Sequence, residues 1–218
     1  MYKDNHKASS NYQNNYSDEF IISFSLMTGS LSETWDASYM HAMKWRWLPI
    51  GDDFVRLFCS RDLDSLIYER EVDAVNAWLR DPHHRAGHIM RDNPSHGTEI
   101  LGGMWGFSRA RDPTTARHIY ARVQRHRVAA HYNRPVANAK GRDQHFLSYY
   151  VYPLLRGRST VHDSYLCQVY RDSEPFPSRR QKSCFVGAAM PYDCMSSEKY
   201  HVCPVACRPK EHTDWTYC

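Results

Sequence analysis

Apolar and polar positions along the chain follow the repeats of both strands and helices, which predicts a mixed α/β fold. Residues 54–59 form a short run rich in aromatic and β-branched residues, bounded upstream by Gly51, and this run predicts a buried strand. From Ser65 onward, apolar residues recur at helical spacing as far as Arg80, and Pro82 then ends the pattern. We expect this second segment to be the most regular helix in the chain.

Shorter patterns predict the remaining elements. Asp112-Pro113 has the composition of a helix start, and Asp143 is a natural N-cap for another helix. The residue before a proline avoids the helical region, so we expect helices to end near Pro49 and Pro153. The predicted segments are a strand at 20–27, a short helix at 40–47, strands at 88–91 and 100–106, a helix after Asp112 and a helix from Asp143 to Pro153.

Two carboxylates, Asp62 and Asp64, come directly after the strand predicted at 54–59. In an α/β sheet a ligand site opens where a strand ends, because the backbone there leaves the packed core. If the strand repeat of two continues, both carboxylates project to the same side and suit a hard divalent cation that also holds a phosphate. The alternative is a turn or a helix cap, in which these side chains satisfy free backbone N–H groups.

Gly102 and Gly103 interrupt the apolar run at 100–106. Glycine costs conformational entropy in a strand, so a pair of glycines indicates that a ligand or another backbone comes close. A bulge or a corner of the sheet is the alternative interpretation.

Composition limits the class of partner. The 218-residue chain has a formal net charge of +4 and a pI near 8.6, which favours an anionic ligand without demanding nucleic acid. Residues 108–142 are markedly basic, which suits phosphates, but a solvated helix face explains them too. Aromatic residues are sparse there, so we expect no nucleic-acid partner. No run approaches the roughly 20 apolar residues that span a bilayer, so we expect no membrane segment.

Five of the seven cysteines fall late in the chain, among glycines and prolines. This clustering predicts a disulfide-linked appendage and therefore an oxidising compartment, either the Golgi lumen or the extracellular space. The glycosylation sequon at Asn15 agrees with that compartment. Zinc is the alternative, because the late cysteines lie close to His201 and His212. The late cysteines are Cys184, Cys194, Cys203, Cys207 and Cys218.

These patterns divide the chain into three parts. Residues 1–19 are polar and predict a flexible arm, residues 20–166 an α/β domain, and residues 167–218 a cysteine-rich appendage packed on it. The apolar run at 20–27 is preceded by Asp18 and Glu19, the wrong flank for a secretory signal, so we interpret it as a strand and see no signal peptide.

A series of motifs between residues 45 and 218 resembles a family of uncharacterised glycosyltransferase-like proteins. In order and character the motifs are similar to those of nucleotide-sugar-dependent transferases of the GT-A fold, a Rossmann-like mixed sheet flanked by helices. Only 61 residues precede Asp62, so we expect the N-terminal nucleotide-binding part to be short or incomplete. The motifs are Ser60-Arg61-Asp62-Leu63-Asp64-Ser65, Arg70-Glu71, Val75-Asn76-Ala77-Trp78-Leu79, His88-Ile89-Met90-Arg91-Asp92, Leu101-Gly102-Gly103-Met104-Trp105-Gly106, Asp143-Gln144-x-Phe146-Leu147 and His162-Asp163-Ser164-Tyr165.

The resemblance implies a metal-dependent transfer of a sugar from a nucleotide-sugar donor to a glycan or another hydroxyl acceptor, with Mn²⁺ or Mg²⁺ held on the diphosphate. A non-catalytic secreted carbohydrate-binding or interaction protein is the alternative. The implied roles are metal ligation by Asp62, Asp64 and His162, screening of a phosphate by Arg61, accommodation of the sugar by Gly102 and Gly103, and catalysis by Asp143 and Asp92.

Overall fold

The computed structural model describes residues 39–125, 141–181, 184–189 and 201–218. The predicted arm at 1–19, the predicted strand at 20–27, the sequon at Asn15 and Cys194 lie outside these residues.

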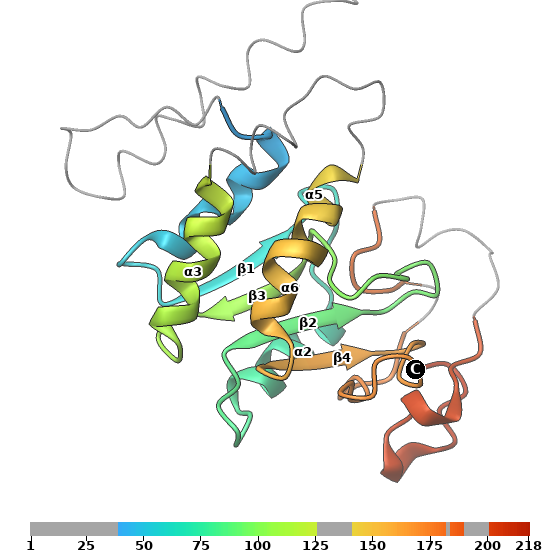
Figure 1. The fold of residues 1–218 in the computed structure, drawn as a ribbon. Helices are drawn as coiled ribbons and strands as arrows, with labels where there is room; N and C mark the ends of the chain where they lie inside the picture. Colours follow the sequence, from blue (N-terminus) through green and yellow to red (C-terminus); the bar gives the residue numbers. More distant parts are fainter. Residues whose placement is uncertain (1–38, 126–140, 182–183, 190–200) are drawn as a thin grey trace, which may run out of the picture.

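A four-stranded sheet forms the centre of the described structure and confirms the mixed α/β prediction. The strands are β1 (Leu57–Arg61), β2 (Gly87–Arg91), β3 (Met104–Ser108) and β4 (Ser159–Asp163), in the order β1-β3-β2-β4. β3 is antiparallel to both β1 and β2, and β4 is parallel to β2. The carboxyl ends of β1, β2 and β4 therefore lie at one edge of the sheet (Figure 1).

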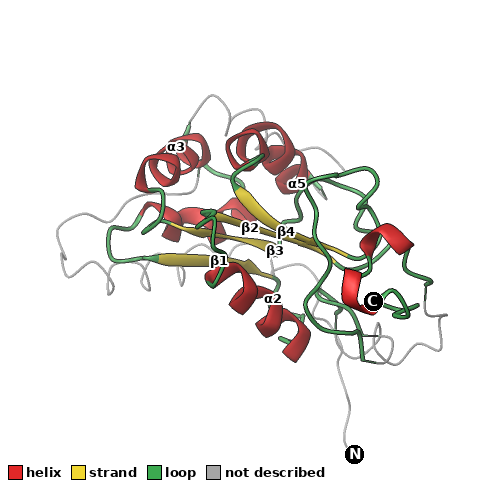
Figure 2. Ribbon diagram, turned by 90° about the horizontal axis from the view of Figure 1, so that it is seen from below, coloured by secondary structure: helices red, strands yellow, loops and turns green. Residues whose placement is uncertain are grey.

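Helices cover both faces of this sheet (Figure 2). One face carries α2 (Glu69–Leu79), and the other carries α3 (Pro113–Gln124) and α5 (Arg142–Phe146). The chain continues from α5 through a π-helical turn at Leu147–Val151 into α6 (Tyr152–Leu155), and a 3₁₀ helix, η1 (Ala42–Gly51), packs with α3.

The larger core lies between the sheet and the α3 side. Its centre is aromatic: the Trp47 ring stacks on Phe146 at 5.8 Å between centroids and meets Trp105 edge-on at 6.3 Å. These three side chains are fully buried, and such aromatic pairs add to the free energy gained by burial alone. A smaller cluster on the α2 side joins Ala74, Met90 and Met104 to Phe176 and Val186 of the C-terminal segment.

Several predicted boundaries are confirmed. α2 ends within one residue of Arg80, and β2 coincides with the strand predicted at 88–91. The N-cap predicted for the helix after Asp112 is also present, because the Asp112 carboxylate accepts the Thr115 N–H at 2.9 Å.

Both predicted proline stops are wrong. Pro49 lies inside η1, and Pro153 lies in the first turn of α6. The first turn of a helix leaves N–H groups without intrahelical partners, so a residue without an N–H is tolerated at the position of Pro153. The run at 54–59 also begins its strand late, because Phe54 is in a turn closed by its N–H to the Asp52 carboxylate at 2.9 Å.

Among the cysteines that the structure describes, two disulfides join parts of the C-terminal tail, the segment from Cys167 onward, and confirm the disulfide prediction. They join Cys167 to Cys207 and Cys203 to Cys218. With these sulfurs paired, Cys203 and Cys207 have no thiolates to offer zinc. The tail lies beside the ends of β2 and β4 (Figure 1). Among the described residues, no helix is long and apolar enough to cross a membrane.

Candidate functional site

A cleft of about 550 Å³ opens at the edge of the sheet where β1 ends and β3 begins. Its walls come from η1, the turn after β1, the loop between β2 and β3, the start of α5 and the C-terminal segment. The polar and glycine residues that line it are His41, Arg46, Asp62, His96, Gly102, Gly103, Gly141, Asp143, Gln144 and Gly187.

Arg46 connects the two acidic positions of this cleft. Its Nη1 pairs with Asp62 Oδ1, and its Nη2 lies 2.8 Å from Asp143 Oδ2. Asp62 follows β1 and Asp143 belongs to α5, so one guanidinium bridges two distant parts of the sequence. The Asp62 side chain remains 45% exposed while that of Asp143 is 12% exposed. Asp62 is therefore the carboxylate more open to a ligand.

The glycine pair allows these side chains to approach the backbone. A Cβ on Gly103 would collide with the Asp62 carboxylate and lie 2.9 Å from the Asp62 backbone N. A Cβ on Gly102 would collide with the Arg46 guanidinium and lie 3.2 Å from Asp143 Oδ2. What comes close to both glycines is thus the protein's own charged cluster at the wall of the cleft.

Gln144 fixes the loop that carries the glycines. Its Oε1 accepts the Gly102 N–H at 3.0 Å, and its Nε2 donates to the Ile100 carbonyl. Both ends of the amide are hydrogen-bonded to backbone groups of the loop, so these two bonds fix the position of the loop against α5.

The structure brings four of the predicted site residues to the cleft, namely Asp62, Gly102, Gly103 and Asp143. Asp64 lies two residues beyond Asp62 in an exposed turn and does not line the cleft. The strand repeat has ended at this point, since Ser65 N–H bonds to the Asp62 carbonyl at 3.3 Å.

Arg61 is engaged with the protein rather than open to a phosphate. Its Nε lies 2.9 Å from Glu71 Oε1, and its two Nη atoms donate to the carbonyls of Gly103 and Leu66 at 3.3 and 3.0 Å. Burial raises the pKa of Glu71, and the positive charge of Arg61 opposes that rise. Arg61 therefore fastens the turn after β1 to α2 and to the glycine loop.

Asp92 is fully buried and lies outside the lining of the cleft. It accepts bonds from Arg70 Nε at 3.1 Å, from Arg180 Nη2 at 2.7 Å, from Ser164 Oγ at 2.5 Å and from the Val186 N–H at 2.9 Å. Burial alone would raise the pKa of Asp92, but the charges of Arg70 and Arg180 outweigh it and lower the pKa. Asp92 thus anchors the C-terminal segment to the sheet as a carboxylate.

His162 lies inside β4 and also outside the lining of the cleft. Its Nδ1 is 2.9 Å from His88 Nε2, and its Nε2 is 4.0 Å from Glu174. Burial, aided by the charges of Arg70 and Arg85, lowers the pKa of His162 to about 3. The ring is therefore a neutral part of the core.

This histidine pair predicts a loss of stability in mild acid. In the unfolded chain these histidines have a pKa near 6.5, so they bind protons below that pH, whereas the buried His88 and His162 stay neutral in the folded protein. The free energy of unfolding therefore falls as the pH drops from 6.5 toward about 3. Each histidine contributes up to about 1.4 kcal/mol per pH unit. Urea unfolding at pH 7.5 and 5.5 measures the difference.

His162→Gln removes one of the buried histidines that cause this pH dependence and should reduce its slope. The exposed His118 offers the matched control, since His118→Gln should leave the dependence unchanged. An equal pH dependence in the wild-type protein and His162→Gln would contradict the assignment.

Among the cleft residues that the sequence did not predict, three have basic side chains: Arg46, His41 and His96. Arg46 and His41 lie in an aromatic-rich helix with no motif around them, and His96 lies in a predicted loop. The buried Nδ1 of His41 has no hydrogen-bond partner among the residues that the structure describes. Burial lowers the pKa of His41, and nearby Asp143 opposes this.

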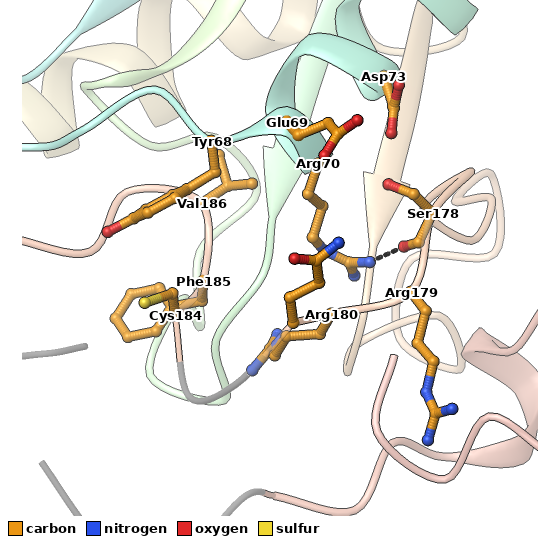
Figure 3. Close-up of a pocket in the computed structure, with 11 residues that line it drawn as sticks. Tyr68, Glu69, Arg70, Asp73, Ser178, Arg179, Arg180, Cys184, Phe185 and Val186 are labelled. Atoms are coloured by element: carbon orange, nitrogen blue, oxygen red, sulfur yellow. Dashed lines mark hydrogen bonds between the residues drawn. The ribbon is translucent and has the colours of Figure 1, made fainter. Parts of the chain in front are cut away.

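A second cavity, of about 420 Å³, lies between α2 and the C-terminal segment (Figure 3). Its arginines suggest an anion site, but Arg70 and Arg180 are already paired with Asp92, and Arg70 also donates to the Ser178 carbonyl. Arg179 extends away from Glu69 and Asp73, which give the opposite wall negative charge (Figure 3). These charges serve the anchoring of the tail, so the first cleft is the better candidate site.

No family model, no curated protein and no solved structure matches this chain. The glycosyltransferase resemblance of its motifs therefore stays a prediction.

Proposed function

We propose that this protein is a divalent-cation-dependent glycosyltransferase of the GT-A type, which moves a sugar from a nucleotide-sugar donor to a hydroxyl of a glycan or another acceptor. One observation carries the proposal: Asp62, Asp143 and the pair Gly102-Gly103 come from three separate stretches of sequence and line one cleft. The resemblance of the motifs gives these residues the metal, catalytic and sugar-contacting roles.

The donor set suits Mg²⁺ or Mn²⁺ held jointly with a substrate. Mg²⁺ is usually bound by one or two carboxylates together with waters and substrate phosphates, and Asp62 offers one half-exposed carboxylate at the cleft. Asp64, in the exposed turn two residues further on, lies outside the cleft lining, so a direct bond from it to the same cation would require this turn to move. When bound, the cation would neutralise charge that develops on the leaving diphosphate. The buried, His88-bonded ring of His162 does not fit this ligand set.

Arg46 and Asp143 account for the remaining chemistry. The guanidinium of Arg46 has two arms, so it can exchange Asp62 for a phosphate oxygen while its Nη2 stays on Asp143. Asp143 is held in one orientation by that pair, and it accepts the proton of the acceptor hydroxyl as the new glycosidic bond forms. The disulfides Cys167–Cys207 and Cys203–Cys218 support a place in an oxidising compartment such as the Golgi lumen or the extracellular space.

A panel of sugar nucleotides tests the proposal. The purified protein is incubated with Mn²⁺ and UDP-glucose, UDP-galactose, UDP-N-acetylglucosamine or GDP-mannose, with and without simple glycoside acceptors. We expect at least one donor to release its nucleoside diphosphate, and a chelator to stop the release. Absence of release from every donor would contradict an active transferase and favour a binding protein.

A further inference from the structure

His96 is a residue of the cleft whose hydrogen bonding defines the tautomer of its ring. It lies on the loop between β2 and β3 and lines the same cleft as Asp62 and Asp143. The backbone N–H of Asp92 donates to His96 Nδ1 at 3.1 Å. Since Nδ1 accepts this bond, the proton of the neutral ring is on Nε2.

The ring of His96 is neutral at physiological pH. Burial is the largest cause and lowers the pKa of His96 to about 4, although the charge of Asp92 opposes it. Phe185 packs edge-on against the ring, with centroids 5.5 Å apart. Among the described residues, Nε2 makes no hydrogen bond, so the ring keeps one N–H donor for a ligand in the cleft.

The position of His96 is fixed through Asp92, whose backbone N–H bonds to the ring and whose carboxylate is itself held by several neighbours. Its partner Asp92 is held by Arg70, Arg180 and the Val186 N–H. Phe185, which packs on the ring, precedes Val186, so both neighbours of the ring are tied to one buried carboxylate. A donor held in this way costs little conformational entropy when it binds a ligand.

We propose that His96 determines sugar specificity in this cleft, by donating its Nε2–H to a hydroxyl oxygen of the transferred sugar. The inference rests on the proposed function and names a contact for it. A neutral imidazole beside an aromatic ring suits an uncharged hydroxyl, whereas the cation Arg46 in the same cleft suits the diphosphate.

Two substitutions separate the two nitrogens of the ring. His96→Asn places an oxygen near the position of Nδ1, so it can accept the Asp92 N–H, but it has no donor at the position of Nε2. His96→Gln reaches that position with an amide N–H and gives up the contact with Asp92. Thermal melts of the nucleotide-free variants serve to check that each one folds.

The experiment compares dissociation constants in Mn²⁺ for UDP, UDP-glucose, UDP-N-acetylglucosamine, GDP and GDP-mannose. In the wild-type protein, at least one sugar nucleotide should bind more tightly than its own diphosphate. His96→Asn should raise the dissociation constant of that sugar nucleotide by about 3-fold to 10-fold, the equivalent of one neutral hydrogen bond. The dissociation constant of the diphosphate should not change. His96→Gln should recover part of the loss.

Each other outcome overturns a specific claim. If no nucleotide binds the wild-type protein, the proposed function fails and this contact falls with it. Another outcome is that nucleotides bind while His96→Asn weakens the binding of a sugar nucleotide and of its diphosphate equally, or changes the binding of neither. In both cases the proposed function stands and the assignment of His96 is wrong. The same holds if no sugar nucleotide binds better than its diphosphate.

Discussion

Asp92→Asn is expected to lower the free energy of unfolding by about 3–5 kcal/mol, the usual cost of removing one partner from a buried ion pair. The substitution keeps the size of the side chain but leaves Arg70 and Arg180 without their negative partner. Both guanidiniums are buried, with side-chain exposures of 6% and 5%, so water cannot replace the carboxylate. Equilibrium unfolding in urea, followed by tryptophan fluorescence, measures the change.

The exposed Asp172 provides the matched control for this prediction. Asp172→Asn makes the same chemical change on the surface and should alter the free energy of unfolding by less than about 0.5 kcal/mol. A loss below about 1 kcal/mol for Asp92→Asn would mean that Asp92 does not anchor the C-terminal segment.

The second large effect is expected on ligand binding. Asp62→Asn combined with Asp64→Asn should abolish the stabilisation that UDP or GDP gives in the presence of Mn²⁺. For the wild-type protein that stabilisation should reach about 2.7 kcal/mol when the ligand is at 100 times its Kd. The melt of the nucleotide-free variant should stay near that of the wild-type protein. Asp64 is exposed, and the ion pair of half-exposed Asp62 with Arg46 contributes at most about 1 kcal/mol.

Asp214→Asn tests whether the charge alone matters, because Asp214 is an exposed acid in the tail. This control should retain the full nucleotide effect. If the double variant instead loses its nucleotide-free stability, the two carboxylates are a structural turn, as the alternative interpretation of the sequence holds.

The sequence was sufficient to predict the elements that are stabilised by interactions between residues close together in the chain. The helical repeat before Arg80 and the Asp112 cap each involve residues within a few positions of one another, and the structure has both. The cysteine-rich tail was also predictable, because clustered cysteines signal disulfides whatever their pairing.

The roles of Asp92 and His162 could not be predicted, because their partners are distant in the sequence. Asp92 meets Arg180 across a separation of 88 residues, and His162 meets His88 across 74. An isolated acid or histidine near a strand reads equally well as a ligand or as a buried partner. Only the packing of β2 against β4 and the tail separates these two cases.

Arg46 is a residue of the cleft that the sequence did not indicate, for the same reason: its partners are distant in the chain. No motif surrounds it, yet it joins Asp62 to Asp143, two residues 81 positions apart in the numbering of the chain. The sequence pointed to each acid separately, and the glycine pair indicated a close approach beside them. The identity of the approaching group, a guanidinium with two acids, depends on how η1 packs on the sheet.

Crystals soaked with Mn²⁺ and UDP or GDP test the central claim most directly, through the anomalous scattering of manganese. We predict a manganese peak within about 2.0–2.3 Å of an Asp62 carboxylate oxygen, a typical carboxylate-to-metal distance, with the diphosphate on its other side. A cleft without manganese, in which Asp62 is still paired with Arg46, would contradict the account.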